Sequence, residues 1–402
     1  MKVALINEYY RSGSTGKLVN ELCVGLNRNF VKTKIFYAVG EYKDEFCEPI
    51  SNRYDQKIHA ILSRLTGLQG YFSYFTTLNF IKRLDLYNPD IIHLHNLHGN
   101  YINLKLLLSY AANKNKAVVI TLHDCWFYTG KCTCYVPAQC KKWKQECGDC
   151  PLLHIDNVNP TFFFDTTRKC LNDKREWFGK IQKLGVIGVS EWVTKEVEQS
   201  LFKDIAEIAT INNWVDTKIF YPRVTDLRSK LCLNDKKIIL LVTSNICKKK
   251  GYDELIYLSK TLPSEYQIIV IGKNIDNLYL TDNIIHIERT DNQDKLAEFY
   301  SIADVCVNTT KYETFGMVTI EAMACGTPVI VYNNTASQYL VPEGFGVVVD
   351  ENNGFDEIKQ AIYKLSKQKK NAFSIISSKT IEKYNIQNAI LAHQKLYEKL
   401  KE

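Results

Sequence analysis

Two glutamates lie eight residues apart in the stretch Lys311–Pro328, with a glycine between them. Glu313 precedes Gly316 and Glu321 follows it, so a loop that turns into a helix there would place the two carboxylates around one helix N-terminus. The unpaired N–H groups and positive dipole of a helix N-terminus suit phosphate. Carboxylates instead accept hydrogen bonds from hydroxyls. We therefore expect the two glutamates to bind sugar and ribose hydroxyls on either side of a phosphate.

Cationic side chains gather in a second loop of the same half of the chain. Lys248, Lys249 and Lys250 precede Gly251, after a predicted strand at Ile238–Val242 and before a predicted helix. Ammonium groups at a strand-to-helix turn suit a diphosphate. A basic turn that only faces solvent is the alternative.

A histidine and an aspartate follow a predicted strand in the first half. His123 and Asp124 come directly after the apolar run Val118–Leu122. At the carboxyl end of a parallel strand, an imidazole can donate to a sugar hydroxyl, and the neighbouring carboxylate can orient it. A histidine that only caps the following turn is the alternative. His95 and His98 follow an earlier strand and fit packed or solvated histidines better than functional ones.

The N-terminal loop carries two glycines. Gly13 and Gly16 lie in the predicted loop Asn7–Lys17, after the strand Val3–Ile6 and before a helix. Their spacing matches neither a Walker loop nor a dinucleotide fingerprint. The glycines either let the backbone approach a ligand closely or form a tight turn that packs the helix on its strand.

A cysteine-dense insertion at 125–151 follows His123. Cys132, Cys140, Cys147 and Cys150 have the spacing C-x7-C-x6-C-x2-C. The C-x2-C pair is typical of tetrahedral zinc sites, and four thiolates would close the coordination shell, giving a structural zinc. Free thiols in a packed loop and redox chemistry are the alternatives.

Composition limits the other possibilities. The 402 residues are enough for two domains, and 51 Lys+Arg against 44 Asp+Glu give a net charge of +7. That charge is too mild to indicate nucleic acid, but it fits an anionic substrate or a membrane surface. The apolar run of the N-terminus MKVALINEYY is too short for a signal peptide, so a cytoplasmic protein with reduced cysteines is expected. The basic, aromatic segment His59–Leu86 fits either the inner face of a membrane or a packed core.

Alternating strands and helices in both halves predict the fold. Apolar runs of strand length alternate with helical segments before and after Asn213–Asp216, which has the composition of a connector. This alternation predicts two doubly wound parallel sheets that face a cleft.

These residues together resemble glycosyltransferase family 4, over nearly the whole chain. The resemblance rests on Glu313-x7-Glu321 with the following Ala-Met-Ala-Cys-Gly-Thr-Pro-Val, on Asn213-Trp214-Val215-Asp216 and on His123-Asp124. The cysteine insertion is similar to that of colanic-acid-type exopolysaccharide transferases. The implied fold is α/β and of GT-B type, with two Rossmann-like domains facing a central cleft.

The implied domains divide the chain at the connector. Residues 1–212 would form the acceptor-side domain with the insertion 125–151, and residues 213–385 the nucleotide-sugar donor domain. Residues 386–402 would form a C-terminal helix that packs back toward the N-terminal domain.

The resemblance also implies roles for individual residues of the donor domain. Glu313 would bind the donor hexose near the reacting carbon, and Glu321 would hold the ribose hydroxyls. The amides of Phe315, Gly316 and Met317 would lie near the sugar and diphosphate.

Further implied roles fall on the basic loop and on the first half. Lys250 would contact the diphosphate and neutralise the leaving nucleotide, His123 would meet the donor sugar from the opposite domain, and Gly16 would let the N-terminal loop approach the phosphates. Asn245 stands where the family commonly has arginine, so Lys249 or its neighbour Lys248 would supply the missing charge. The family's N-terminal glycine pair is likewise replaced by Gly13-Ser14-Thr15-Gly16.

The implied reaction is transfer of a hexose from a UDP- or GDP-sugar, with retention of configuration, to a growing surface polysaccharide or a lipid-linked glycan. No cofactor is expected to be required for catalysis. A nucleotide-sugar epimerase of the same architecture and a non-enzymatic zinc-loop binding protein are the alternatives, but neither accounts for Glu313, Lys250 and His123 together.

Overall fold

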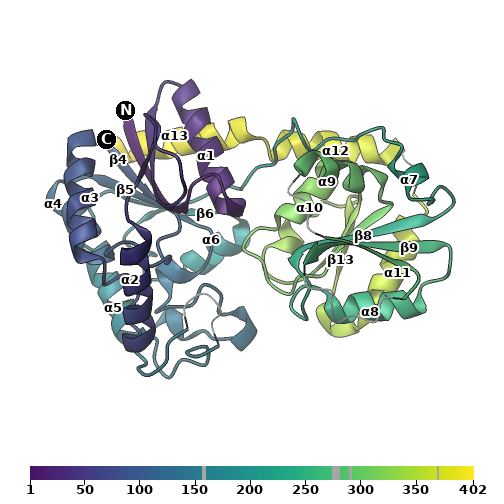
Figure 1. The fold of residues 1–402 in the computed structure, drawn as a ribbon, viewed down its shortest axis with the longest axis horizontal. Coiled ribbons are helices and arrows are strands. Elements are labelled where there is room, and N and C mark those ends of the chain that lie inside the picture. The colour runs from purple at the N-terminus through teal and green to yellow at the C-terminus, as the bar shows by residue number, and fades with distance from the viewer. Residues whose placement is uncertain (156–159, 274–280, 289–291, 369–370) are drawn as a thin grey trace. The chain divides into compact units, whose positions relative to one another are not determined.

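The computed structural model describes residues 1–155, 160–273, 281–288, 292–368 and 371–402 (Figure 1). These residues form two compact units. The first contains Met1–Asn212 together with Ala389–Glu402, and the second contains Asn213–Asn388.

The first unit is built on a seven-stranded sheet in the order β3-β2-β1-β4-β5-β6-β7 (Figure 1). Every pairing between neighbours is parallel. The strands are β1 Lys2–Tyr9, β2 Lys32–Val39, β3 Cys47–Pro49, β4 Ile91–Leu94, β5 Ala117–Leu122, β6 Leu184–Gly188 and β7 Glu207–Thr210.

Residues 40–46, between the parallel strands β2 and β3, form neither helix nor strand. The other strands of this sheet are connected through helices, as is usual for parallel pairing. They are α1 Gly13–Arg28, α2 Arg53–Thr66, α3 Tyr74–Tyr87, α4 Leu104–Asn113, α5 Thr167–Phe178 and α6 Glu191–Val197. The connection after β5 is different, because its described residues 123–155 and 160–166 form three short 3-10 helices and otherwise neither helix nor strand. These are η1 Trp126–Tyr128, η2 Val136–Ala138 and η3 Lys142–Lys144.

The second unit repeats the plan with a six-stranded parallel sheet in the order β10-β9-β8-β11-β12-β13. Its strands are β8 Lys237–Asn245, β9 Tyr266–Lys273, β10 Ile284–Ile287, β11 Val305–Asn308, β12 Val329–Tyr332 and β13 Gly346–Val349. Its helices are α7 Leu227–Lys230, α8 Tyr252–Thr261, α9 Gln293–Ile302, α10 Met317–Ala324, η4 Ser337–Tyr339, η5 Glu351–Asn353, α11 Phe355–Leu365 and α12 Asn371–Lys383. The last helix, α13 Ile386–Lys401, runs into the part of the chain that belongs to the first unit.

Both sheets reverse their strand order at one point. The chain moves outward from β1 to β3 and then returns to place β4 on the other side of β1, and it does the same around β8 and β11. In open α/β sheets, ligands bind at the carboxyl ends of the strands beside such a switch point. The fold therefore marks the β1–β4 and β8–β11 edges as the places to look for sites.

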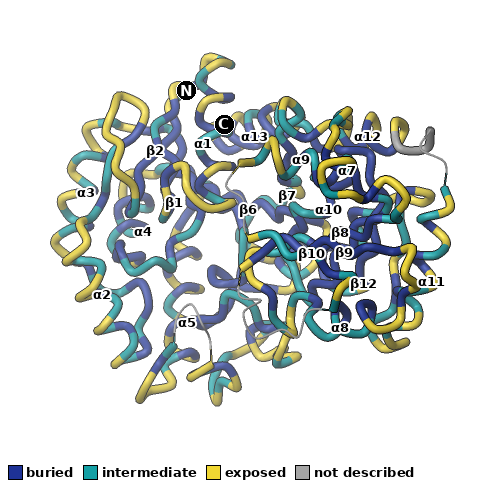
Figure 2. The backbone as a smooth tube through the Cα atoms, turned by 45° about the vertical axis from the view of Figure 1, so that its right-hand side comes forward, coloured by how far each residue is buried: buried dark blue, intermediate teal, exposed yellow. Residues whose placement is uncertain are grey.

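Burial explains why the strands are so apolar. All residues of β4, β5, β6, β11 and β12 are buried, and the strand interiors are dark blue in Figure 2. Parallel sheets covered on both faces carry such continuous apolar runs. In the second unit, side chains of β8, β9 and β11 form one core cluster with those of α8 and α11.

Helix starts follow the usual side-chain caps. Asn52, Asn103, Ser190 and Asn292 accept hydrogen bonds from N–H groups in the first turns of α2, α4, α6 and α9. Such caps satisfy N–H groups that have no partner within the helix.

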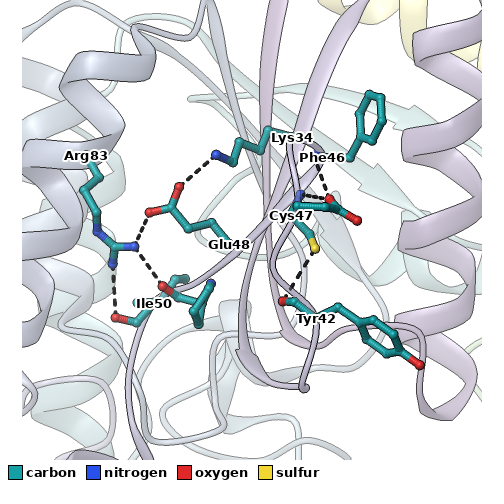
Figure 3. A network of polar contacts seen from close by, with 9 residues as sticks. Lys34, Tyr42, Phe46, Cys47, Glu48, Ile50 and Arg83 are labelled. Carbon is teal, nitrogen blue, oxygen red and sulfur yellow. Dashed lines mark hydrogen bonds and ion pairs between the residues drawn. The ribbon is translucent and has the colours of Figure 1, made fainter.

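The edge of the first sheet is tied to α3 by charge (Figure 3). Glu48 of β3 accepts from Lys34 of β2 at 2.8 Å and pairs with Arg83 of α3. The Arg83 guanidinium also donates to the carbonyls of Pro49 and Ile50. A strand of only three residues is held in place through these side-chain contacts in addition to its ladder.

The predicted α/β architecture of two doubly wound sheets is confirmed, and the predicted strands recur within one to three residues at each end. The predicted loop Asn7–Lys17 is wrong in extent. β1 continues to Tyr9 and α1 already begins at Gly13, because the helix extends one turn beyond its apolar face.

Candidate functional site

A small pocket lies at the switch point of the second sheet. It opens between the carboxyl ends of β8 and β11 and the start of α8. Its lining consists of Leu241, Val242, Thr243, Ile246, Lys250, Gly251, Leu255, Val270, Val307, Asn308, Thr309 and Thr310. Lys250 supplies the cationic side chain of this lining.

The basic loop is fixed to the end of β11 by its backbone. Lys250 forms an isolated bridge with Thr310, and the Lys311 N–H donates to the Lys249 carbonyl at 3.0 Å. Gly251 has a φ of +88°, and a Cβ there would lie 2.4 Å from the Thr309 Oγ1. Only glycine allows this close approach, so the sequence Lys-Gly sets the position of the Lys250 side chain.

Glu313 lies next to this pocket, within a small polar network. The Asn308 Nδ2 donates to the Thr319 Oγ1 at 3.1 Å and reaches the Glu313 Oε2 at 3.5 Å. The Thr310 Oγ1 donates to the Asn308 Oδ1 at 2.8 Å. The end of β11 and the start of α10 thereby hold the carboxylate from two sides.

The environment of Glu313 shifts its pKa in both directions. Burial raises the pKa of Glu313, while the nearby Lys250 ammonium and hydrogen bonds from Asn308 and Thr310 lower it. The structure therefore brings together the two residues that the sequence placed in separate loops, Lys250 and Glu313.

The N-terminus of α10 borders the same carboxylate. Gly316 precedes the helix with a φ of +111°, and a Cβ on it would lie 2.8 Å from the Glu313 Oε2. The backbone amides of the first turn, beginning with Met317, are the kind of donors that bind a phosphate. Phe315 is buried and packs its ring edge against Tyr384, at 5.9 Å between ring centroids.

Glu321 is placed differently from the expectation that both carboxylates surround the helix N-terminus. It is the fifth residue of α10, more than one turn from the start of the helix, and its Oε2 accepts from the Tyr300 hydroxyl of α9 at 3.1 Å. Glu321 thus lies beside α9 and one turn down the helix.

The remaining predicted residues of the basic loop are more exposed. Asn245 ends β8 opposite Lys273 and faces solvent. Lys249 is also exposed, with its ammonium 5.8 Å from the centroid of the Tyr312 ring. Neither lines the pocket, whereas Lys250 does.

Sequence reasoning missed the polar residues at the end of β11. Asn308, Thr309 and Thr310 are buried and line the pocket, and Thr319 is bonded to Asn308. The run Asn-Thr-Thr directly after an apolar strand was the available signal, because residues at a carboxyl strand end border the ligand site.

In the first unit, His123 directly follows β5, and one of its partners is His95, which was not expected from the sequence. Its Nε2 is 3.0 Å from the Nδ1 of His95, and the two rings stack at 5.3 Å. Asp124 instead pairs with His98, at 2.8 Å between Oδ2 and Nε2. Asp124 also acts on the charge of His123, so its predicted role in orienting that ring stays a prediction.

A second polar group adjoins this pair. The Glu8 Oε2, from β1, lies 3.9 Å from the His98 Nδ1. A Cβ on Gly99 would lie 2.3 Å from the Glu8 Cδ, so this glycine makes room for the carboxylate. Burial raises the pKa of Glu8, and His98 opposes that shift. His98 is thus part of a polar cluster at the carboxyl ends of β1, β4 and β5, whereas the sequence favoured a packed or solvated histidine without a functional role.

His123 is kept neutral by its surroundings. Burial lowers its pKa to about 4, although Asp124 acts in the opposite direction. A neutral imidazole can donate one hydrogen bond and accept another, which suits contact with a sugar hydroxyl.

The two N-terminal glycines lie in the first turn of α1. Gly13 is its first residue and has a φ of +65°, with open space where a Cβ would stand. A Cβ on Gly16 would come 3.1 Å from the Tyr9 carbonyl oxygen. Gly16 therefore lets α1 pack closely against the end of β1, which is one of the two roles predicted for it.

The four predicted zinc ligands are gathered at one place. Cys132, Cys140, Cys147 and Cys150 all line a single cavity in the connection after β5. All thirteen cysteines of the chain are thiols. Within the part of the chain that the structure describes, no three histidine, cysteine or acidic side chains converge closely enough to hold a metal ion as positioned.

Two doubly wound domains with a polar pocket at a switch point define the class of protein, a GT-B-fold glycosyltransferase. The chain belongs to Glycosyltransferase Family 4, whose model matches residues 15–219. A second model, described as Glycosyl transferases group 1, matches residues 224–400. The family predicted from the Glu313, Asn213 and His123 motifs is confirmed.

Curated relatives agree with this family. WcaC of Escherichia coli K12, whose name places it in colanic acid biosynthesis as a glycosyl transferase, is 25% identical over 294 residues, covering 68% of this chain and 69% of WcaC. A 41.2 kDa protein from the cps region of Klebsiella pneumoniae is 24% identical over 329 residues, covering 80% of this chain and 82% of that protein.

Solved structures share the fold at low identity. The sucrose-phosphate synthase of Thermosynechococcus elongatus aligns with a TM-score of 0.66 and 19% identity, covering 99% of this chain and 98% of that one. Alr3699/HepE of Anabaena, in complex with UDP-glucose, aligns with a TM-score of 0.66 and 14% identity, covering 100% and 99%.

Proposed function

We propose that this glycosyltransferase moves a hexose from a UDP- or GDP-sugar to a growing surface polysaccharide or a lipid-linked glycan, with retention of configuration. The observation that carries the proposal is the grouping of Lys250, Asn308, Glu313 and the α10 N-terminus at the switch point of the second sheet. This grouping offers a cation and helix amides to a diphosphate, and a carboxylate and an amide to sugar hydroxyls.

The chemistry proposed for this site is stabilisation of a leaving group. As the bond from the anomeric carbon to the diphosphate breaks, negative charge grows on the departing oxygen. Lys250 and the amides that follow Gly316 are placed to meet that charge, and each well-placed donor contributes about 3 to 4 kcal/mol in such sites. Glu313 would hold the hexose, and Glu321 the ribose.

Names of relatives support the substrate class. WcaC is named for colanic acid biosynthesis, and the Klebsiella pneumoniae relative is named for the cps region. The Anabaena structure holds UDP-glucose on a protein of the same fold. From these names we propose that the donor is a nucleotide sugar and that the product is a surface polysaccharide.

A thermal-shift screen tests the donor. UDP-glucose, UDP-galactose, GDP-mannose, UDP and GDP are added to the protein at equal concentrations. The matching donor at about 100 times its Kd should stabilise the protein by about 2.7 kcal/mol. The anomeric configuration of the product, read by NMR, then tests retention. A protein that responds to none of these ligands, or that releases an isomerised sugar without an acceptor, contradicts the proposal.

We further propose that α2 brings the protein to a membrane surface where a lipid-linked acceptor lies. Tyr54, Ile58, Ile61 and Leu65 form an apolar stripe along α2, with exposed fractions between 38% and 79%. Three more exposed rings, Phe162, Phe163 and Phe164, adjoin the end of this helix, where the Phe162 N–H donates to the Arg64 carbonyl. The basic residues Arg53, Lys57 and Arg64 lie on the same helix.

Apolar side chains beside basic ones favour the interface of an anionic bilayer. No helix among the described residues is long and apolar enough to cross a membrane. The proposal is therefore contact with the surface.

Vesicle co-sedimentation tests this contact. The double variant Ile58→Glu, Ile61→Glu should bind vesicles of anionic phospholipid at least about 10-fold more weakly than the unmodified protein, because two exposed apolar side chains that would enter the bilayer are replaced by charged ones. Leu391→Glu, at a residue of α13 that is 53% exposed, is the matched control and should bind normally. Equal binding by both variants would remove α2 from the contact.

A further inference from the structure

The connection between β5 and α5 is long and irregular for a compact domain. Its described residues, 123–155 and 160–166, contain three 3-10 helices of three residues each and otherwise no regular structure. Long irregular connections in compact domains are uncommon, and small irregular segments are often held by cross-links. Four thiols line one cavity in this connection.

Four thiols line this cavity, those of Cys132, Cys140, Cys147 and Cys150. The first two come from separate parts of the connection, and the last two lie at the two ends of one turn. Cys132 follows η1, Cys140 follows η2, and the last two follow η3. A group that bound all four would join the three 3-10 segments at one point.

The turn between Cys147 and Cys150 is built to present both thiols. Its central residues, Gly148 and Asp149, have φ values of +136° and +45°, and Lys142 donates its ammonium hydrogens to both their carbonyls at 2.9 and 3.1 Å. Glycine and aspartate are among the residues that adopt positive φ most readily. A C-x2-C turn whose two thiols line one cavity is the arrangement that tetrahedral metal sites use.

Charge at the cavity complements a tetrathiolate centre. Four thiolates on Zn²⁺ leave a net charge of about −2, and two buried lysines adjoin the cavity. Lys131 lines it and is 1% exposed, and Lys174 is 2% exposed and interacts electrostatically with Cys147 and Cys132. The Lys131 ammonium donates to the Leu153 carbonyl and the Thr161 hydroxyl, and the Lys174 ammonium donates to the carbonyls of Trp126 and Thr129. Positive charge held beside the cavity in this way would stabilise a negatively charged centre.

We propose that Cys132, Cys140, Cys147 and Cys150 bind one structural Zn²⁺. The free volume of the cavity is about 10 Å³, which is enough for about one water molecule or one ion. The thiols surround the cavity but do not converge on one point as positioned, so binding requires rotation about the cysteine Cα–Cβ bonds to reach Zn–S distances of about 2.3 Å. The four thiols lose their protons as the bonds form. The closed shell stabilises the connection and leaves no position for substrate.

Metal analysis of the full chain, purified without a histidine tag, tests the proposal. We expect about one zinc per chain. Removing it with a chelator should make four further thiols reactive toward a thiol reagent under native conditions. It should also lower the unfolding midpoint by at least about 5 °C, because the cross-link among the 3-10 segments is lost.

Variants then assign the ligands. Cys147→Ser and Cys150→Ser should each lose the zinc, whereas Cys134→Ser, in the same connection but outside the cavity lining, should keep it. If the serine variants do not fold, Co²⁺ is substituted into the unmodified protein. The charge-transfer absorption of a tetrathiolate site then shows whether four thiolates bind the metal. Zinc absent with all thiols reactive, a disulfide between two of the four cysteines, iron in place of zinc, or equal zinc in all variants would overturn the proposal. Nucleotide-sugar binding is measured separately, so failure here leaves the proposed transferase function standing.

Discussion

Replacing Lys250 with methionine is expected to lower kcat/KM for sugar transfer by about 100-fold or more. The side chain lies half-buried in the pocket at the β8–β11 switch point, held there by the bridge from Lys250 to Thr310 and by the close approach of Gly251 to Thr309. Losing one positioned donor to a developing negative charge costs about 10²–10³ in rate. The measurement is steady-state transfer with the donor identified by thermal shift.

Glu313→Gln is the companion variant, because it keeps the size of the side chain and removes only the charge. We expect a loss of similar size, since the carboxylate beside Asn308 and Gly316 is the proposed acceptor for the donor hydroxyls. Both variants should unfold within about 2–4 °C of the unmodified protein, equivalent to about 1 kcal/mol for a domain of this size.

Lys260→Met is the matched control for the lysine variant. Lys260 is exposed in the last turn of α8, outside the pocket lining, and its loss should leave transfer unchanged. Unchanged transfer by Lys250→Met or Glu313→Gln would instead show that this pocket is not the donor site.

Acidification is expected to destabilise the first unit strongly below about pH 6.5. Four histidines, His93, His95, His123 and His393, form a chain of rings with neighbouring centroids 4.2 to 5.7 Å apart. Burial lowers the pKa of His123 and of His393 to about 4, and those of His93 and His95 well below the usual value of 6.5.

The sign of the effect follows from where protons bind first. In the folded chain these imidazoles stay neutral, whereas in the unfolded chain they take up protons as the pH falls through 6.5. Stability is therefore complete above about pH 7 and is lost between pH 6.5 and the lowered folded-state pKa values. Each such histidine contributes about 1.4 kcal/mol of lost unfolding free energy per pH unit in that range.

Urea unfolding of the full chain at pH 7.5, 6.5 and 5.5 measures this slope. His393→Leu removes one titrating ring from the cluster and should flatten the slope, whatever it does to stability at pH 7.5. His154→Gln replaces an exposed histidine of the same unit and should leave the slope unchanged. A slope that His393→Leu does not alter would exclude the ring cluster as the acid-sensitive element.

The strands and the family were predictable from the sequence because they depend on local patterns. Apolar runs such as Val3–Ile6 and Val118–Leu122 are strands as predicted, since a strand buried on both faces must be apolar throughout. The motif Glu313-x7-Glu321 with Gly326-Thr327-Pro328 identified the family because it, too, is a local pattern of residue types and spacings. Gly316 and Gly326, with φ of +111° and +85°, are where the chain needs left-handed backbone at the two ends of α10.

The sequence also determined which residues could act as cations, carboxylates and thiols, because those properties belong to the side chains themselves. Only the tertiary structure decided which of them meet. Lys250 and Glu313 approach each other because strand order places β8 beside β11. Asp124 pairs with His98, which lies far from it in the sequence, because the carboxyl ends of parallel strands converge.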